Sequence, residues 1–154
     1  MGVIQDPEGD PMTQLTLDLA QKLLADTLAH CRTNNFNPMA VVVLDADGSI
    51  RAAASEDNTT FMRWRVAYGK AFGAVAFGMP SRRTNNMAAE RPHFVAALNG
   101  LANGNVVPVP GGVIIRDQDK KILGAIGVSG DTSDNDEAAA IAAITAAGLV
   151  ADGG

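Results

Sequence analysis

The sequence predicts an α+β fold in which helices cover a mainly antiparallel sheet. Two pairs of apolar, strand-like runs are each joined by a short polar turn, at residues 45–48 and 117–120. An amphipathic segment precedes them, an alanine-rich segment follows them, and both have helical capping patterns. Consecutive strands joined by tight turns pair antiparallel, and flanking helices then cover the faces of the sheet.

Length and composition are those of one globular domain. The chain has 154 residues, of which 47% are hydrophobic and 19% charged, which is enough to bury a core without disulfides. We expect a flexible arm over residues 1–11 and a single domain over residues 12–154. The lone Cys31 and an acidic, proline-containing start without a signal-peptide or membrane-spanning pattern favour a cytoplasmic protein that does not contact a membrane.

The first predicted elements are a helix and a β-hairpin. Apolar residues recur every three or four positions over residues 17–31, and Thr16 is a suitable N-cap. A continuous apolar run at residues 39–44 is typical of a buried strand. The turn at residues 45–48 then leads into a returning strand over residues 49–54.

The second helix is predicted over residues 61–77, with Thr59 or Thr60 as its cap. Gly69 and Gly73 lie four residues apart within it. Each costs about 1 kcal/mol of helix stability relative to alanine, so we expect them to allow a close contact. The partner could be the sheet, a second subunit or a flat ligand.

The segment that follows is predicted as a loop over residues 81–90. Pro92 is well placed to open a short helix over residues 93–99, and Gly100 ends that helix.

Three strands and a helix are predicted for the remainder of the chain. The strands cover residues 106–109, 113–116 and 122–128, the first at an edge because of Pro108. We place the strand at 122–128 in the middle of the sheet. Ser133 and Asp136 have capping-box spacing, which predicts a final helix that runs to about Val150.

Charge is distributed unevenly along the chain. The net charge is −5, yet residues 51–91 hold seven basic and three acidic residues. A basic middle in an acidic protein argues against general nucleic-acid binding and is compatible with a local site for a carboxylate. A solvated basic face explains the same pattern equally well.

Several runs of residues resemble one known family. They read VAYGKA at 66–71, FGMPS at 77–81, PVPGGV at 108–113 and GAIGVSGDTSDNDE at 124–137. These runs and their spacing are similar to the family of GlcG, HbpS and the PduO C-terminal domain, over nearly all of residues 15–149. The resemblance implies a profilin-like α/β/α sandwich with a five-stranded antiparallel sheet and a homo-oligomer. Some members of this family bind or degrade haem, and others accompany glycolate or diol catabolism.

Two segments depart from the usual pattern of that family and contain most of the candidate site residues. They are MRWR at 62–65 and ERPH at 90–93. One hypothesis is a small-molecule-binding protein for a flat, apolar, anionic ligand such as haem or an organic acid, in a pocket near the oligomer interface. Its predicted ligand-binding residues are Arg63, Trp64, Arg65, Lys70, Arg91, Gly111, Gly112 and Asp131.

Two other hypotheses remain open. The chain could be a cofactor-free enzyme (an isomerase, lyase or cyclase) on an organic-acid or polyketide-like substrate, with His93 or Glu90 moving a proton and an arginine holding a carboxylate. It could also be a structural or accessory subunit. No metal-ligand spacing is present, and helix capping explains most of the acidic residues at 131–137. We expect any site to lie between the helix at 61–77, residues 90–93 and the junction at 124–137.

Overall fold

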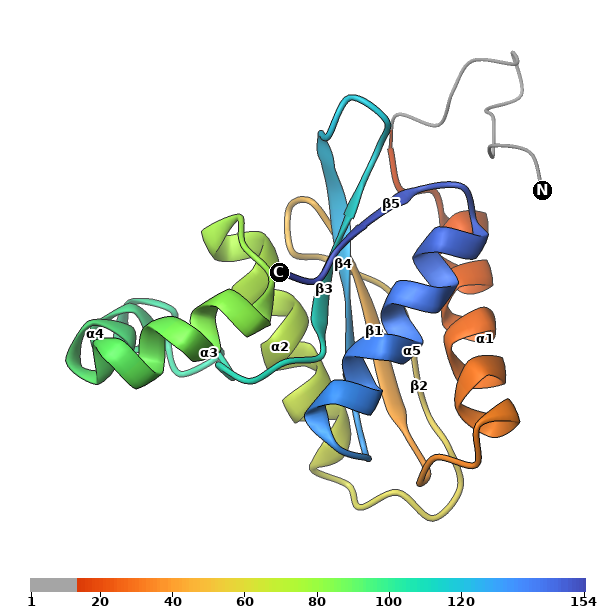
Figure 1. Ribbon diagram of the computed structural model, residues 1–154, viewed down its shortest axis with the longest axis horizontal. Coiled ribbons are helices and arrows are strands. Elements are labelled where there is room, and N and C mark those ends of the chain that lie inside the picture. The colour runs from red at the N-terminus through yellow and green to blue at the C-terminus, as the bar shows by residue number, and fades with distance from the viewer. Residues whose placement is uncertain (1–13) are drawn as a thin grey trace.

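An antiparallel sheet forms the middle layer of the protein (Figure 1). The computed structural model describes residues 14–154, and within them the sheet has five strands in the order β2-β1-β4-β3-β5. The strands are β1 (Ala40–Asp45), β2 (Ile50–Ser55), β3 (Gly112–Arg116), β4 (Ile122–Ser129) and β5 (Val150–Asp152). The described residues thus confirm the predicted five-stranded antiparallel sheet, with β4 in its middle.

Helices cover both faces of this sheet. The helices α1 (Leu17–Thr33) and α5 (Ser133–Ala146) lie on one face, and α2 (Arg63–Phe77) lies on the other (Figure 1). Two further helices, α3 (Ser81–Glu90) and α4 (Pro92–Leu101), project sideways beyond α2. This arrangement is the predicted α/β/α sandwich.

Small side chains let α2 lie close to the sheet. Three alanines of this helix are fully buried against apolar residues of β1, β3 and β4. A Cβ atom placed on Gly127 of β4 would collide with the backbone carbonyl of Ala67. Most of the larger aliphatic residues of the core lie on the opposite face, against α1 and α5. The position of α2, which begins beside the candidate site, is therefore fixed by backbone packing.

The predicted hairpin and first helix are confirmed. Thr16 caps α1 by accepting a hydrogen bond from the N–H of Leu19 at 3.1 Å. In the turn between β1 and β2, Asp45 Oδ1 accepts bonds from the N–H groups of Asp47 and Ser49. The Asp45 side chain thus adds to the backbone bonds of the turn, in which the N–H of Gly48 donates to the carbonyl of Asp45 at 3.0 Å.

The predicted loop at residues 81–90 is wrong, because this segment is the helix α3. Its polar composition does not indicate a helix, which is instead held in place by contacts with distant parts of the chain. Ser81 Oγ accepts a bond from the N–H of Gly112 at 2.7 Å, and Arg82 binds both Asp134 and Glu137 of α5. These long-range contacts stabilise a helix that local propensity does not favour.

The predicted strand at residues 106–109 is also wrong. Pro108 and Pro110 remove backbone donors there, and the segment packs against α2 instead. The fifth strand is β5, which begins at Val150, where the last helix was predicted to end; that helix ends earlier, at Ala146. It pairs with β3, where Arg116 also binds Asp152 at 2.8 Å.

Two predicted caps differ as well. Neither Thr59 nor Thr60 caps α2, whose N-cap Met62 makes no side-chain cap bond. Thr132, not Ser133, caps α5 by accepting from the N–H of Asn135 at 3.2 Å. Asp136 therefore does not complete a capping box. The predicted arm over residues 1–11 lies outside the described residues.

Candidate functional site

An open groove of about 760 Å³ lies where the start of α2 meets the β1–β2 turn and residues 104–107. Its volume is in the range of roughly 300–1,000 Å³ that small-molecule pockets occupy. Its walls are mainly apolar, with backbone and amide groups between the apolar side chains. They are formed by Gly48, Ser49, Ile50, Met62, Trp64, Arg65, Val66, Tyr68, Gly104, Asn105 and Val107.

The two glycines of α2 place one wall of the groove. A Cβ on Gly69 would lie 2.5 Å from Val107 Cγ2, and one on Gly73 would lie 3.1 Å from Val106 Cγ1. The N–H of Val107 donates to the carbonyl of Gly69 at 3.2 Å. The close contact predicted from these glycines is therefore with residues 105–107, which lie directly on the helix.

Trp64 and Arg65 provide the exposed aromatic ring and the positive charge of the groove. The Arg65 guanidinium carbon lies 5.3 Å from the centre of the Trp64 ring, within cation–π range. Trp64 remains 40% exposed, so its ring is available to a ligand. Arg65 is the one charged residue among the described residues that line the groove. The pair offers a flat apolar surface beside a carboxylate-binding cation.

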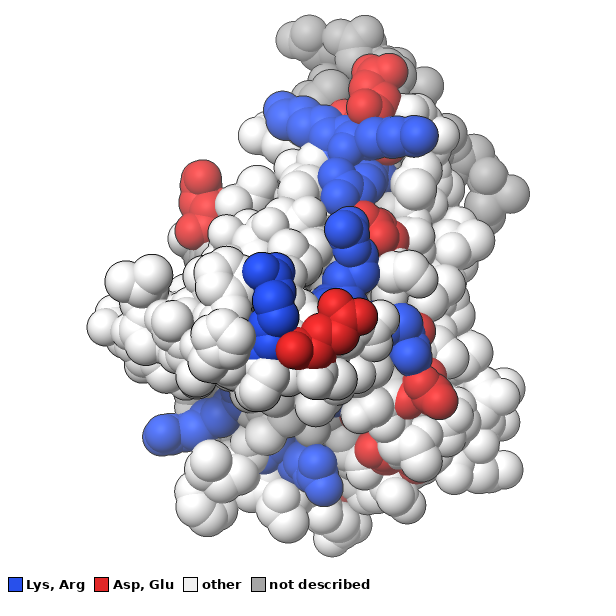
Figure 2. Space-filling view, turned by 60° about the vertical axis from the view of Figure 1, so that its left-hand side comes forward, with Lys and Arg blue, Asp and Glu red and all other residues white. Residues whose placement is uncertain are grey.

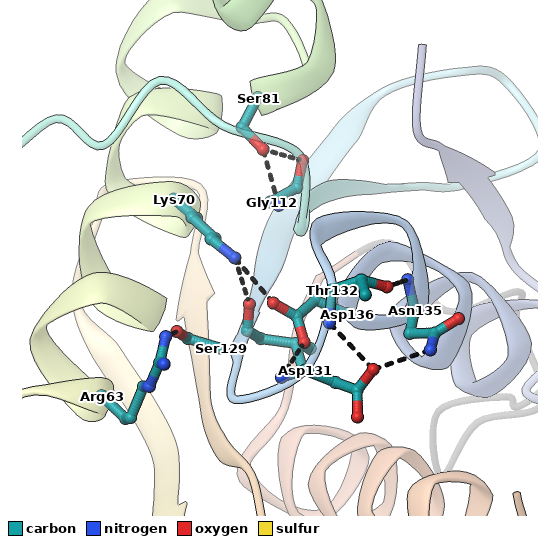
Figure 3. Close-up of polar contacts among 10 residues, drawn as sticks. Arg63, Lys70, Ser81, Gly112, Ser129, Asp131, Thr132, Asn135 and Asp136 are labelled. Carbon is teal, nitrogen blue, oxygen red and sulfur yellow. Dashed lines mark hydrogen bonds and ion pairs between the residues drawn. The ribbon is translucent and has the colours of Figure 1, made fainter. Parts of the chain in front are cut away.

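Lys70 lies on the same helix but is directed into the protein. Its Nζ lies 2.9 Å from Asp136 Oδ2 and 2.8 Å from the carbonyl oxygen of Val128 (Figure 3). Both charged side chains are buried. Burial lowers the pKa of Lys70 and raises the pKa of Asp136, and the attraction between the two charges opposes both shifts. This cation therefore joins α2 to α5 and does not face the groove.

The polar residues around Lys70 also form hydrogen bonds with other residues of the protein. Asp131 accepts bonds from the N–H groups of Asn37 and Thr132 and from the side chain of Asn135, and these bonds lower its pKa. Arg63 donates to Ser129 Oγ at 3.3 Å (Figure 3). The junction between β4 and α5, where we expected part of a site, is thus filled by internal contacts.

Gly111 and Gly112 pack against the same lysine. A Cβ on Gly111 would lie 2.8 Å from Lys70 Nζ, and a Cβ on Gly112 would collide with the Lys70 backbone carbonyl. Gly111 also has a φ of +123°, which side-chain-bearing residues rarely adopt. Because these two residues have no side chain, α2 can lie close to them. Their role is therefore in packing.

Glu90, Arg91 and His93 lie together at the α3–α4 corner and do not line the groove. All three are exposed. Glu90 and Arg91 border a depression of about 240 Å³. The Arg91 guanidinium carbon lies 4.6 Å from the centre of the Phe94 ring. The structure therefore separates the two predicted clusters of site residues, one at the start of α2 and one at this corner.

The described residues contain no group of three or more His, Cys, Asp or Glu side chains arranged to hold a metal ion.

Figure 2 shows basic and acidic side chains interspersed over the face it presents. Arg82 is bound to Asp134 and Glu137. Within residues 14–154, no helix is both long and apolar enough to cross a membrane.

Sequence reasoning missed part of the groove. Ile50, Asn105 and Val107 line it but were predicted only as strand or turn residues. Their one available signal was the Gly69–Gly73 spacing, which predicted a close contact with the sheet, a second subunit or a flat ligand, whereas the contact found is with residues 105–107. Tyr68 also lines the groove and was not among the predicted site residues.

Solved structures of several proteins share this fold. A PduOC–haem complex matches with a TM-score of 0.80 and 21% identity, over 91% of this chain and 99% of its own. HbpS matches with a TM-score of 0.75 and 23% identity, over 94% and 98% of the two chains. The Klebsiella pneumoniae protein ORFY matches with a TM-score of 0.78 and 19% identity, over 96% and 99%.

Sequence comparison identifies the family. No curated protein sequence matches the chain. Residues 15–145, however, match the family described as "Haem degrading protein HbpS-like". This match spans both helical layers and the four strands β1 to β4. The chain therefore belongs to the HbpS-like family.

Proposed function

We propose that the protein binds a flat, apolar, anionic ligand of the haem type in the groove at the start of α2. The observation that carries this proposal is the exposed Trp64 ring, which lies beside Arg65 in a groove of about 760 Å³. A planar ring can stack on the indole, and a peripheral carboxylate can pair with the guanidinium. One similar structure is a haem complex, which supports the same ligand class.

The residues that line the groove suit the apolar ring and one carboxylate of haem. Ile50, Met62 and Val107 provide apolar contacts for the ring, and Arg65 can bind one of its carboxylates. For iron, the lining residues offer only the Met62 thioether and the Tyr68 phenol as side-chain ligands of the kinds that hold haem in proteins. Bound haem would supply redox chemistry at its iron, and the residues of this chain would bind and orient the ring.

A titration with haem tests the proposal. Adding haem to the full chain should produce a saturable, shifted Soret band with one haem per groove. Trp64→Ala should weaken haem binding by about tenfold or more, since stacking of a planar ring on an aromatic side chain contributes about 1–3 kcal/mol. Leu17→Ala, which removes an exposed apolar side chain of α1 outside the groove, is the control. Absence of a saturable spectral change would contradict the proposal.

We also propose that the protein forms a homo-oligomer through α4 and the groove rim. Phe61, which precedes the groove residue Met62 in the chain, is 80% exposed, and Leu101 at the end of α4 is 84% exposed. Burial of these exposed apolar side chains in a subunit contact would be favourable. Leu101→Glu should lower the mass of the particle measured by light scattering, whereas Thr145→Glu on the exposed side of α5 should not. An unchanged mass in the first variant would contradict this part of the proposal.

The enzymatic alternative rests on Glu90 and His93. Both lie on the exposed α3–α4 corner, apart from the groove with its stacked arginine. We therefore prefer ligand binding as the function of this chain.

A further inference from the structure

We infer that the groove recognises the ring and a carboxylate of a planar tetrapyrrole but not its metal, so that iron-free porphyrin binds about as tightly as haem. This inference rests on the proposed function and specifies its ligand class. It follows from which side chains line the groove and from where the stronger iron ligands of the described chain lie.

The groove lacks the side chains that bind haem iron most strongly. Among the described residues that line it there is no histidine, cysteine, aspartate or glutamate. Protein-bound haem is most often held by histidine, cysteine thiolate or a histidine–methionine pair. A strong bond from this chain to the iron would therefore have to come from elsewhere in the fold.

The stronger ligands within residues 14–154 are engaged or located outside the groove. His30 lies near the end of α1, where its ring packs edge-on against Phe36 with the centroids 5.9 Å apart. His93 lies on α4, at the exposed corner described above. Cys31 is fully buried, and burial raises the pKa of its thiol to about 11, so it stays protonated and does not ligate.

Two side chains of kinds that hold haem iron in some proteins remain in the groove, a methionine thioether and a tyrosine phenol. Met62 precedes the first turn of α2 and is half-exposed, so its flexible thioether is not held in one position. Tyr68 packs its ring against Phe72, with the centroids 5.7 Å apart, which places it in the aromatic layer of the helix face.

The other contacts that the groove offers do not distinguish haem from iron-free porphyrin. Stacking on Trp64, apolar contact with Ile50 and Val107, and pairing with Arg65 all address the ring or its carboxylates. Haem and iron-free protoporphyrin IX share this ring and these carboxylates. Their dissociation constants should therefore agree within about threefold, which is less than the tenfold that corresponds to 1.4 kcal/mol.

A comparison of the two porphyrins tests the inference. Trp64 is the single tryptophan of the chain, so its fluorescence reports occupancy of the groove directly. Haem and iron-free protoporphyrin IX are titrated into the full chain, and quenching of Trp64 emission is followed together with the visible absorption bands. The same titrations are run on the Met62→Leu, Tyr68→Phe double variant, which keeps the apolar walls but removes both remaining ligands.

The outcomes separate this inference from the proposed function. Affinities within about threefold, unchanged by the double variant, support the inference. If haem binds at least tenfold more tightly than iron-free porphyrin, or if the double variant loses tenfold in haem affinity, the inference is overturned while the proposed function stands. If neither porphyrin saturates the groove, both are overturned.

Discussion

Lys70 Nζ and Asp136 Oδ2 lie 2.9 Å apart, and each side chain is only 2% exposed. The pair joins the helix that forms the groove to the start of α5. Asp136 Oδ1 also accepts a bond from the N–H of Asp131, and Lys70 donates to the carbonyl of Val128. These bonds satisfy both buried charges and fix how α2 lies against β4.

Removal of one charge from this pair should be strongly destabilising. Asp136→Ala leaves Lys70 buried without a counter-charge, so we expect the free energy of unfolding to fall by about 3–5 kcal/mol. Chemical denaturation of the purified protein measures this. Asp134→Ala is the matched control, because Asp134 is 82% exposed and pairs with Arg82 at the surface. We expect the control to lose less than about 1 kcal/mol.

Replacement of both charges should cost less than the two single changes together. Lys70→Met with Asp136→Leu removes both buried charges and fills the same space with apolar groups, which proteins often tolerate well. A double-mutant cycle with the two single variants measures the coupling. Additive losses would show that the two residues act independently and would contradict the pairing described here.

The hydrogen bonds to Asp131 predict a pH-dependent contribution to stability. They lower its pKa from the ordinary value of 3.8, with the bond from the Asn37 N–H as the largest cause. A carboxyl whose folded-state pKa is depressed stabilises the protein above its unfolded-state pKa and loses this effect as the pH falls through the folded-state value. Asp131→Asn should therefore cost about 1 kcal/mol at pH 7.

The pH profile of this variant distinguishes charge from shape. The difference in unfolding free energy between wild type and Asp131→Asn should shrink as the pH is lowered below 3.8. Urea denaturation from pH 7 to acidic pH follows it, with Asp57→Asn on an exposed loop as the control. A difference that stays constant over the whole range would exclude the charged hydrogen bonds as its cause.

Two helical glycines should respond oppositely to alanine. A Cβ on Gly69 would meet Val107 Cγ2 at 2.5 Å and Asn105 O at 2.9 Å, so Gly69→Ala should displace the groove wall and lower the melting temperature. A Cβ on Gly100 of α4 would meet nothing within 4 Å, so Gly100→Ala should stabilise the helix by up to about 1 kcal/mol. Thermal unfolding of both variants measures this, and equal shifts would contradict the packing account.

Much of the fold could be predicted from the sequence because its local signals agree with the tertiary structure. The apolar run that became β4, the Asp45 turn and the Thr16 cap each specify their conformation with neighbouring residues alone. The helix α3 could not be predicted in this way. It depends on Ser81 and Arg82 binding residues of β3 and α5, and such partners are not visible in the local sequence.

The candidate site was predictable only in part for the same reason. MRWR at 62–65 stood out as unusual, and Trp64 and Arg65 do line the groove. Lys70 carries the same charge as Arg65 and lies on the same helix. It follows Arg65 by five residues, however, so the rotation of the helix directs it toward Asp136 and away from the groove. Val107 joins the groove only because Gly69 lets its segment lie on α2.

The central claim, that Arg65 and Trp64 form the ligand site, is tested most directly by the haem affinity of two matched variants. Arg65 and Arg91 each lie over an aromatic ring, at 5.3 Å and 4.6 Å, but only Arg65 lines the groove. We predict that Arg65→Ala weakens haem binding by about tenfold or more while Arg91→Ala leaves it unchanged. Equal losses in both variants, or a loss only in Arg91→Ala, would contradict the account.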